Sequence, residues 1–358
     1  MGSATLTRLQ RQRRNDLLAV VKTAPGEGNV ELKDVPEPRA EPGWIVVEVV
    51  ACGVCGTDLH ILHDQFKSYP PVTLGHEYTG HIAEIGAGVE GWHLGDRVVV
   101  EQHAGACGTC DLCRRGNVHL CLHKRPPGVG INGALAARVV VPAWLAHRVP
   151  DDVTDRAAAM CEPLAIALTG LESISLQPGE SVAVIGPGPV GLLAALAARH
   201  LGAGRLVVIG RASSSLFRLQ LASQLGLETF DSSSRDPLEA LGASFSDGFD
   251  VVLESAGAAA AIALGVRLLR RGGRMACLGM GDGSDVAFPW DEAMSRALTL
   301  HFSLSSAYPT WNHALHLLRS IGPQVERLAT DFPLARWSDA FEAVANKQVT
   351  KALLWPAL

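Results

Sequence analysis

The sequence lacks an apolar run long enough to cross a membrane, because Gly, Pro or charged residues interrupt each such stretch well before about 18 residues. Four arginines lie in the first 16 residues, but the apolar run that follows, residues 17–21, is too short for a secretory signal. The myristoylation motif is also missing, because position 6 is Leu rather than Ser or Thr. We interpret residues 1–16 as a basic N-terminal tail and expect a cytoplasmic protein with no membrane partner.

The body of the chain also lacks a long Lys/Arg run, and its formal net charge is −5. This balance argues against nucleic acid as a partner. Hydrophobic residues make up 47% and charged residues 19% of the 358, so disorder is not expected and two domains are the simplest division.

Eight cysteines are present. In a short secreted chain they would suggest disulfides, but in a chain of this length without a signal peptide they point to metal binding or catalysis. Four of them follow the pattern C-x2-C-x2-C-x7-C, which suits one closed tetrahedral zinc site of structural role. An iron–sulfur cluster and two disulfides are the alternatives. These four are Cys107, Cys110, Cys113 and Cys121.

The periodicity of the chain changes near residue 180. Residues 17–150 contain short β-branched runs such as WIVVEVVA (44–51) and ARVVVP (137–142), which predict a β-rich domain. Residues 180–304 alternate apolar strands with helical segments, which predicts a doubly wound parallel sheet. Residues 305–358 read as helix, strand, helix and strand, and could close either domain.

Two further motifs carry candidate functional residues. Cys55, His76 and Glu77, with Glu162 as a fourth candidate, offer a mixed ligand set that suits zinc with one open position. On the residues alone, a buried histidine and a surface glutamate explain this set equally well. The motif GPGPVG (186–191) follows a predicted strand and opens a predicted helix, which is the context of a dinucleotide-binding turn.

Taken in order, GVCGTD, GHE, GDRVVV, the four-cysteine cluster, EPL and GPGPVG resemble the zinc-dependent medium-chain alcohol dehydrogenase family. Within it, CGTDLH and Glu162–Pro163 are most similar to the polyol (sorbitol) and threonine dehydrogenase branch. The resemblance implies an α/β fold with a Rossmann-type domain over 168–305. It also implies a β-rich GroES-like catalytic domain over 17–167 and 306–358.

By the same resemblance, Cys55, His76, Glu77 and Glu162 would bind a catalytic zinc, giving two zinc ions per chain. Asp58 would orient His76. Thr57 would take the proton of the substrate hydroxyl and His60 would relay it, the alternative being an ordinary turn residue and a surface histidine. Three cysteines remain as buried thiols, with Cys161 a weaker alternative ligand to Glu162; these are Cys52, Cys161 and Cys277.

Cofactor choice is predicted from the end of the second Rossmann strand, where related enzymes carry an acid. This chain has Gly210 there, followed by Arg211. Because an acid would repel a 2′-phosphate and an arginine would pair with it, we expect NADP to be preferred over NAD. The alternative is that Arg211 stacks on adenine and NAD is still accepted. The predicted cofactor-binding residues are Gly186, Gly188, Pro189, Val190, Gly191, Gly210, Arg211, Ser213 and Arg218.

The expected activity is hydride transfer between a nicotinamide cofactor and a secondary alcohol of a polyol, cyclitol, sugar or amino alcohol, with the corresponding ketone as product. Three alternatives stand beside it: a threonine-type 3-dehydrogenase, a zinc-free reductase of the same superfamily, and a zinc-stabilised protein that senses NADP(H) or redox state without turnover. A homodimer or homotetramer is expected, with the predicted strand LTLHFSL (298–304) extending the sheet across a two-fold axis.

Overall fold

The structure is a computed structural model that describes residues 16–242, 247–281 and 285–358. The predicted basic tail, apart from Asp16, therefore lies outside the described residues. The described residues form two compact units, one of residues 16–160, 330–345 and 351–358 and the other of residues 161–242, 247–281, 285–329 and 346–350. Within the described ranges, no helix combines the length and apolar character needed to span a membrane.

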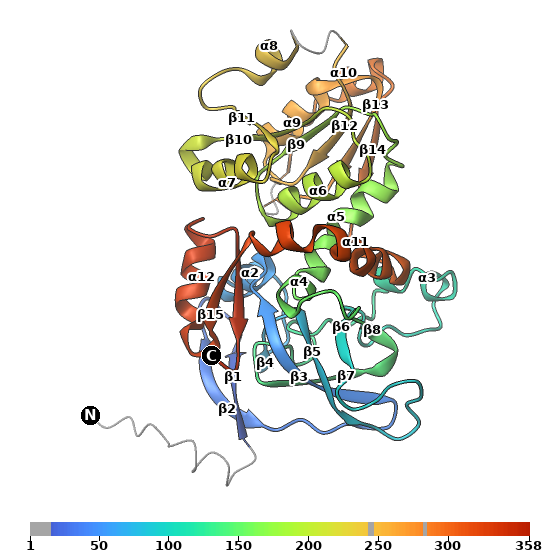
Figure 1. Cartoon of the computed structure of the whole chain (residues 1–358), viewed down its shortest axis with the longest axis vertical. Coiled ribbons are helices and arrows are strands. Elements are labelled where there is room, and N and C mark those ends of the chain that lie inside the picture. Colours follow the sequence, from blue (N-terminus) through green and yellow to red (C-terminus); the bar gives the residue numbers. More distant parts are fainter. Residues whose placement is uncertain (1–15, 243–246, 282–284) are drawn as a thin grey trace, which may run out of the picture. The chain divides into compact units, whose positions relative to one another are not determined.

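The first unit is rich in antiparallel strands, as the short β-branched runs predict (Figure 1). Its larger sheet has the order β15-β16-β3-β5-β6-β8, with β7 also paired to β3, and its smaller sheet has the order β2-β1-β4. The central strand β3 contains the run WIVVEVVA, most of whose side chains are buried. The strands are β1 (Asp16–Lys22), β2 (Val30–Pro36), β3 (Trp44–Gly53), β4 (Val72–Thr73), β5 (Glu77–Ile85), β6 (Arg97–Val100), β7 (Arg138–Pro142), β8 (Ala146–Arg148), β15 (Ala329–Pro333) and β16 (Lys351–Trp355).

The helices of this unit have between 3 and 9 residues. They are α2 (Gly56–Leu62), α3 (Asp111–Arg114), η1 (Val118–Leu120), η2 (Ala143–Leu145), α4 (Asp155–Ala158), η3 (Leu334–Arg336) and α12 (Trp337–Ala345).

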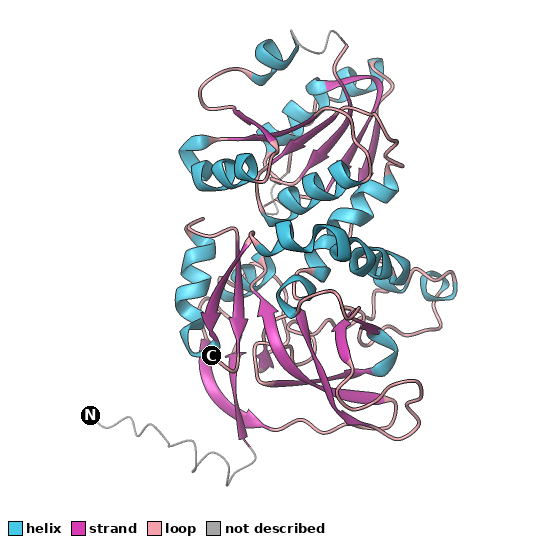
Figure 2. Ribbon diagram, viewed as in Figure 1, coloured by secondary structure: helices cyan, strands magenta, loops and turns pink. Residues whose placement is uncertain are grey.

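The second unit is a six-stranded parallel sheet of order β11-β10-β9-β12-β13-β14, with helices on both faces (Figure 2). Counted from β9, this is the strand order 3-2-1-4-5-6 of the dinucleotide-binding Rossmann fold. All residues of β9 and β10 are buried, which explains why these strands are apolar throughout. The strands are β9 (Val182–Ile185), β10 (Leu206–Gly210), β11 (Glu228–Asp231), β12 (Phe249–Glu254), β13 (Leu269–Cys277) and β14 (Thr299–Phe302). The helices are α5 (Cys161–Ser173), α6 (Pro189–His200), α7 (Ala212–Gln224), α8 (Pro237–Gly242), α9 (Ala259–Leu268), α10 (Trp290–Ser295) and α11 (Tyr308–Glu326).

The observed units differ from the predicted domain boundaries in three places, the third being residues 346–350, which belong to the second unit. The first unit ends at Met160 rather than at residue 167. Helix α11, predicted to belong to the catalytic domain, lies in the second unit because its apolar face packs against α5 and α6. The sequence from residue 258 to residue 273 predicts one continuous helix, but α9 ends at Leu268 and residues 269–273 form the start of β13, where Leu269 pairs with Phe249.

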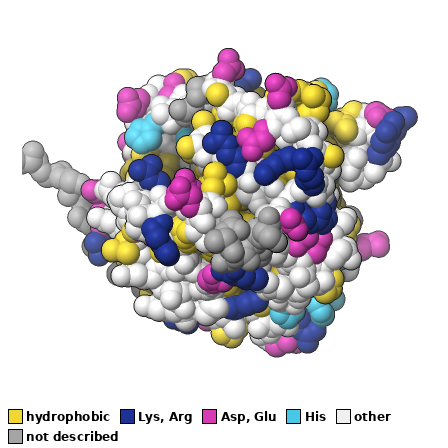
Figure 3. All heavy atoms as spheres, turned by 90° about the horizontal axis from the view of Figure 1, so that it is seen from above, with side chains coloured by type: hydrophobic (Ala, Val, Ile, Leu, Met, Phe, Trp, Pro, Cys, Tyr) yellow, Lys and Arg dark blue, Asp and Glu magenta, His cyan; other side chains and the backbone are white. Residues whose placement is uncertain are grey.

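The face drawn in Figure 3 carries basic and acidic side chains side by side, with hydrophobic ones between them. No continuous basic surface is visible among the residues drawn there in colour. This face therefore offers no surface of one sign to a polyanion.

Candidate active site and metal centres

Three predicted zinc ligands come together in the first unit. One ligand atom each from Cys55, His76 and Glu77 lies within 4.8 Å of the other two. Cys55 precedes α2, and Glu77 is the first residue of β5. The antiparallel pairing of β3 with β5 sets Gly53 opposite Glu77, so Cys55 and Glu77, which are 22 positions apart in sequence, meet at one end of the sheet.

Asp58 holds the backbone of both ligand-bearing segments. Its carboxylate accepts hydrogen bonds from the amide of Cys55 (2.9 Å) and from the amide of Gly75 (3.2 Å), the residue before His76. The side chain is fully buried, and this burial raises the pKa of Asp58 despite the nearby His76. No direct bond between the Asp58 and His76 side chains is seen among the described residues, so the orientation of His76 by Asp58 stays a prediction.

The donor set fits a zinc ion. The Nδ1 atom of His76 is buried and has no hydrogen-bond partner among the described residues. A buried imidazole nitrogen without a partner is costly unless a metal ion or another group satisfies it. One thiol, one imidazole and one carboxylate are ligands that zinc accepts, and three protein ligands leave a coordination position open.

Lys351 is a member of this site that sequence reasoning missed. Its Nζ forms a buried ion pair with Oε2 of Glu77 and donates a hydrogen bond to the carbonyl of Val54 (3.1 Å). Gly53 leaves room for this pair, because a Cβ there would lie 2.3 Å from Oε2 of Glu77. The only sequence signal was a lysine at the start of an otherwise apolar strand, KALLW.

The remaining predicted catalytic residues occupy different surroundings. Thr57 Oγ1 lies 3.6 Å from the Cys55 sulfur, on the first turn of α2. His60 is exposed at the other end of α2 and its Nδ1 is 3.0 Å from Oε1 of Gln65. Glu162 is buried as the second residue of α5, in the second unit, and is not one of the three grouped ligands.

The four-cysteine cluster forms a second, closed group. The sulfur atoms of Cys107, Cys110, Cys113 and Cys121 lie within 4.8 Å of one another. Gly105, Gly108 and Gly116 all have positive φ, which allows the loop to turn tightly around them. Hydrogen bonds from the amides of Cys110 and Thr109 lower the pKa of Cys107 to about 5, which favours the thiolate that binds zinc. No disulfide joins any of the eight cysteines, all of which lie among the described residues.

The glycine-rich turn joins β9 to α6 in the second unit. Gly186 has φ +102°, Gly188 is the N-cap of α6, and Pro189 and Val190 open the helix. A Cβ at Gly191 would lie 2.0 Å from the Gly186 carbonyl and 2.4 Å from Oγ of Ser255. Ser255, which the sequence did not single out, donates to the carbonyls of Ile185 (3.0 Å) and Gly186 (2.9 Å) and so fixes the turn. The backbone amides at this helix start can therefore approach a pyrophosphate.

The end of β10 carries the residues predicted to select the cofactor. Gly210 ends the strand, Arg211 is the exposed N-cap of α7, and Ser213 is exposed in its first turn. Arg218 is buried, and its Nη2 donates to the carbonyl of Val349 (2.9 Å) in the same unit. Arg218 therefore has a protein partner, and its predicted contact with a phosphate stays a prediction.

Comparison with known proteins agrees with this geometry. Residues 41–151 match the model of the alcohol dehydrogenase GroES-like domain, and residues 189–320 match that of the zinc-binding dehydrogenases. A sorbitol dehydrogenase of Halalkalibacterium halodurans is 34% identical over 341 residues, covering 94% of this chain and 99% of that protein. The chain belongs to the zinc-dependent medium-chain alcohol dehydrogenase family.

Other members of this dehydrogenase family are about as similar. An L-threonine 3-dehydrogenase of Pectobacterium atrosepticum is 34% identical over 348 residues, covering 94% of this chain and 93% of that protein. Among solved structures, an alcohol dehydrogenase of Thermus sp. ATN1 has a TM-score of 0.86 at 33% identity, covering 94% of this chain and 99% of that one. A structure from Sinorhizobium meliloti, assigned to the zinc-binding dehydrogenases and bound to NADP, has a TM-score of 0.88 at 32% identity, covering 95% of this chain and 99% of that one.

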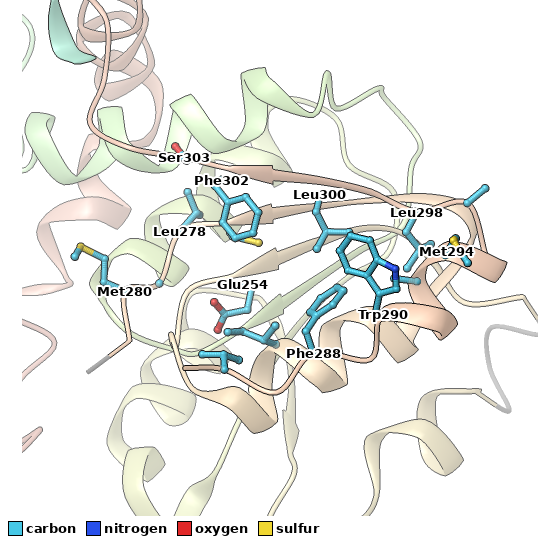
Figure 4. Close-up of a pocket in the computed structure, with 16 residues that line it drawn as sticks. Glu254, Leu278, Met280, Phe288, Trp290, Met294, Leu298, Leu300, Phe302 and Ser303 are labelled. Carbon is cyan, nitrogen blue, oxygen red and sulfur yellow. The ribbon is translucent and has the colours of Figure 1, made fainter. Parts of the chain in front are cut away.

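The dehydrogenase also has a large apolar cavity of about 830 Å³ in its second unit, beside the edge strand β14 (Figure 4). Buried Glu254 lies in its wall; one carboxylate oxygen accepts from the amides of Ala256 and Gly257, and burial raises the pKa of the group. Large apolar side chains beside the cavity are strongly exposed; these are Met280, Trp290, Met294 and Phe302.

Proposed function

We propose that this zinc-dependent dehydrogenase oxidises a secondary alcohol of a hydroxylated substrate such as a polyol, cyclitol, sugar or amino alcohol, with NADP preferred over NAD. The observation that carries the proposal is the open Cys55/His76/Glu77 group, which exists in addition to the closed four-cysteine group. A closed group is sufficient for a structural role. An open one is needed only where a substrate or water must reach the ion.

Cys55, His76 and Glu77 would hold the catalytic zinc, and Glu162 is proposed as a further ligand, direct or through water. When bound, zinc supplies Lewis-acid polarisation of the substrate hydroxyl. Residues of the chain itself would remove the proton of the substrate hydroxyl. Thr57, which touches the Cys55 sulfur, would accept the hydroxyl proton and pass it toward exposed His60, which releases it to solvent.

Hydride transfer requires the nicotinamide nucleotide to lie on the second unit. The turn Gly186–Gly191 and the start of α6 would bind the pyrophosphate. Arg211 and Ser213 would meet the 2′-phosphate, with Arg218 as a further candidate. The NADP found in the Sinorhizobium meliloti structure supports this choice without deciding it for this chain.

The substrate class rests on the ligand set and on the relatives. The sorbitol dehydrogenase and the threonine 3-dehydrogenases are both about one-third identical to this chain. Leu164 follows Glu162–Pro163, as in polyol enzymes, so the polyol class is favoured and threonine-type oxidation is the second candidate.

A screen of NADP⁺ and NAD⁺ reduction across polyols, cyclitols, amino alcohols, L-threonine and simple secondary alcohols tests the proposal, together with metal analysis. Turnover with two zinc ions per chain is the expected result. One zinc per chain with no alcohol turnover would contradict it and favour a nucleotide- or redox-sensing protein.

We also propose that the protein is a homodimer or homotetramer built through the β14 edge. Strand β14 is the last strand of its sheet, and the exposed apolar side chains there lie beside a cavity of the same unit (Figure 4). An open strand edge with an apolar face is suited to pairing with a second copy.

A further inference from the structure

The end of β10 has no room for the acidic residue that usually binds the ribose of NAD. A Cβ at Gly210 would lie 2.8 Å from Cγ of Pro187 and 3.0 Å from Cδ2 of Leu219. Any side chain at this position would have to displace Pro187, which belongs to the glycine-rich turn itself. If a carboxylate acts on the ribose, it has to come from a neighbouring element.

The adjacent strand β11 ends at Asp231, which places a carboxylate beside the end of β10. The parallel pairing of β10 with β11 sets Asp231 directly beside Gly210. Oδ1 of Asp231 accepts a hydrogen bond from the amide of Ala212 (2.8 Å), the first residue of α7. The amide and hydroxyl of Ser232 both donate to the Gly210 carbonyl, at 2.8 and 3.1 Å, so the loop after β11 closes over the end of β10.

The same carboxylate is held in its charged form. The amide and hydroxyl of Ser233 donate to Oδ1 at 2.9 and 2.6 Å. These bonds and the one from the Ala212 amide lower the pKa of Asp231 to about 2. A fixed negative charge therefore occupies the start of α7, where a 2′-phosphate would otherwise find the helix amide and the positive end of the helix dipole.

We propose that Asp231 is the residue that limits the preference for NADP, by repelling a 2′-phosphate and by accepting a hydrogen bond from a free 2′-hydroxyl. This inference rests on the proposed binding of the cofactor at the end of β10. Arg211 precedes Ala212, and Arg235 lies over the ring of Phe230 at 5.3 Å. These two cations favour the phosphate and Asp231 opposes them, so the balance sets the ratio of NADP to NAD use.

The test is binding of 2′,5′-ADP and of 5′-ADP to Asp231→Asn, measured by calorimetry on the full-length protein. The amide keeps an oxygen for the Ala212 and Ser233 donors but removes the charge. We expect the affinity for 2′,5′-ADP to rise about tenfold relative to that for 5′-ADP, and kcat/KM for NADP⁺ relative to NAD⁺ to rise in parallel.

Asp236→Asn is the matched control, because it removes one charge from the same loop at a carboxylate that accepts from the Leu238 amide (2.8 Å). An equal rise in the affinity for 2′,5′-ADP relative to 5′-ADP in Asp236→Asn would overturn the inference. So would an unchanged ratio of these two affinities in Asp231→Asn. If Asp231→Asn folds poorly, Asp231→Ser, whose hydroxyl can also accept from the loop amides, carries the same expectation. Wild-type protein that binds neither nucleotide would overturn the proposed cofactor site itself, a result distinct from binding without a change in the ratio.

Discussion

Glu77 is the residue on which the chemistry of the open site depends, because two cations compete for its carboxylate. Oε2 of Glu77 pairs with the ammonium of Lys351, and both side chains are buried. A zinc ion held by Cys55 and His76 would draw on the same carboxylate. Lys351 therefore places a buried positive charge against the carboxylate that the proposed zinc ion would also use.

Lys351→Met should lower the free energy of unfolding of the zinc-free protein by about 3–5 kcal/mol, because it leaves a buried carboxylate without its partner. Zinc would supply the missing positive charge, so the loss should be smaller in the zinc-loaded protein. Urea unfolding of both forms measures the difference. Lys347→Met, at an exposed lysine, is the control, and an equal loss with and without zinc would count against this account.

Thr57→Ala should lower kcat by roughly 100-fold, because it removes the hydroxyl proposed to take the substrate proton. Thr57→Ser keeps a hydroxyl and should retain most of the activity. The zinc content of both variants should equal that of the wild type, since Thr57 is not one of the grouped ligands. Unchanged turnover in Thr57→Ala would remove this residue from the mechanism.

At the scale of elements, we expect two glycines at the start of α6 to have different roles: one is needed for packing and the other for cofactor binding. Gly191 has the Gly186 carbonyl and Ser255 against it, whereas a Cβ at Gly188 would have no neighbouring heavy atom within 4 Å. Both glycines belong to the predicted turn, but only one of them is required for the turn to close.

Gly191→Ala should cost about 1–3 kcal/mol in the free energy of unfolding, because the added methyl overlaps packed atoms. Gly188→Ala should change stability by less than about 1 kcal/mol but weaken binding of 5′-ADP at least tenfold, because the methyl fills the space beside the pyrophosphate. Thermal unfolding and calorimetry on the two variants measure both quantities. If Gly188→Ala and Gly191→Ala lost the same affinity for 5′-ADP and the same free energy of unfolding, Gly188 would also be a packing residue.

Strands and turns could be predicted from the sequence where a local pattern of residues specifies them. The strand at residues 44–51 and the turn at 186–191 follow from periodicity and glycine spacing, and both are present. Residues 269–273 continue a helical pattern in sequence, yet the pairing of Leu269 with Phe249 draws them into β13. Helix α11 has a clear apolar face, but the sequence does not say which unit that face packs against.

At the scale of the whole molecule, the predicted assembly depends on β14. The side chain of Phe302, at the end of this edge strand, is 78% exposed, and Trp290 is 70% exposed. Exposure of such large apolar groups together is unusual for a surface that stays in water.

Phe302→Glu should shift the protein toward the 37.8 kDa monomer in multi-angle light scattering, because a charge in an apolar contact opposes association. Leu122→Glu, at a leucine that is 89% exposed in the first unit, should leave the mass unchanged. A wild-type protein that is already monomeric would refute the proposed assembly.

The sequence predicted the site residues that lie in short motifs, but it did not predict those that are distant in sequence and close only in the fold. Cys55, His76 and Glu77 form a group as expected. Lys351 joins them across 274 residues, and Asp231 meets Gly210 only because two parallel strands share a register. Neither contact can be predicted from the local spacing of residues, because both depend on which strands become neighbours in the sheet.

The 274-residue separation between Glu77 and Lys351 also has a consequence for synthesis. A ribosome adding roughly 5–20 residues per second needs about 14–55 s to reach Lys351 after Glu77. During that interval the strands around the nascent metal site can pair, but the glutamate has no ammonium to neutralise it. Zinc captured on the ribosome would fill this gap, so metal supply during translation should influence the yield of folded enzyme.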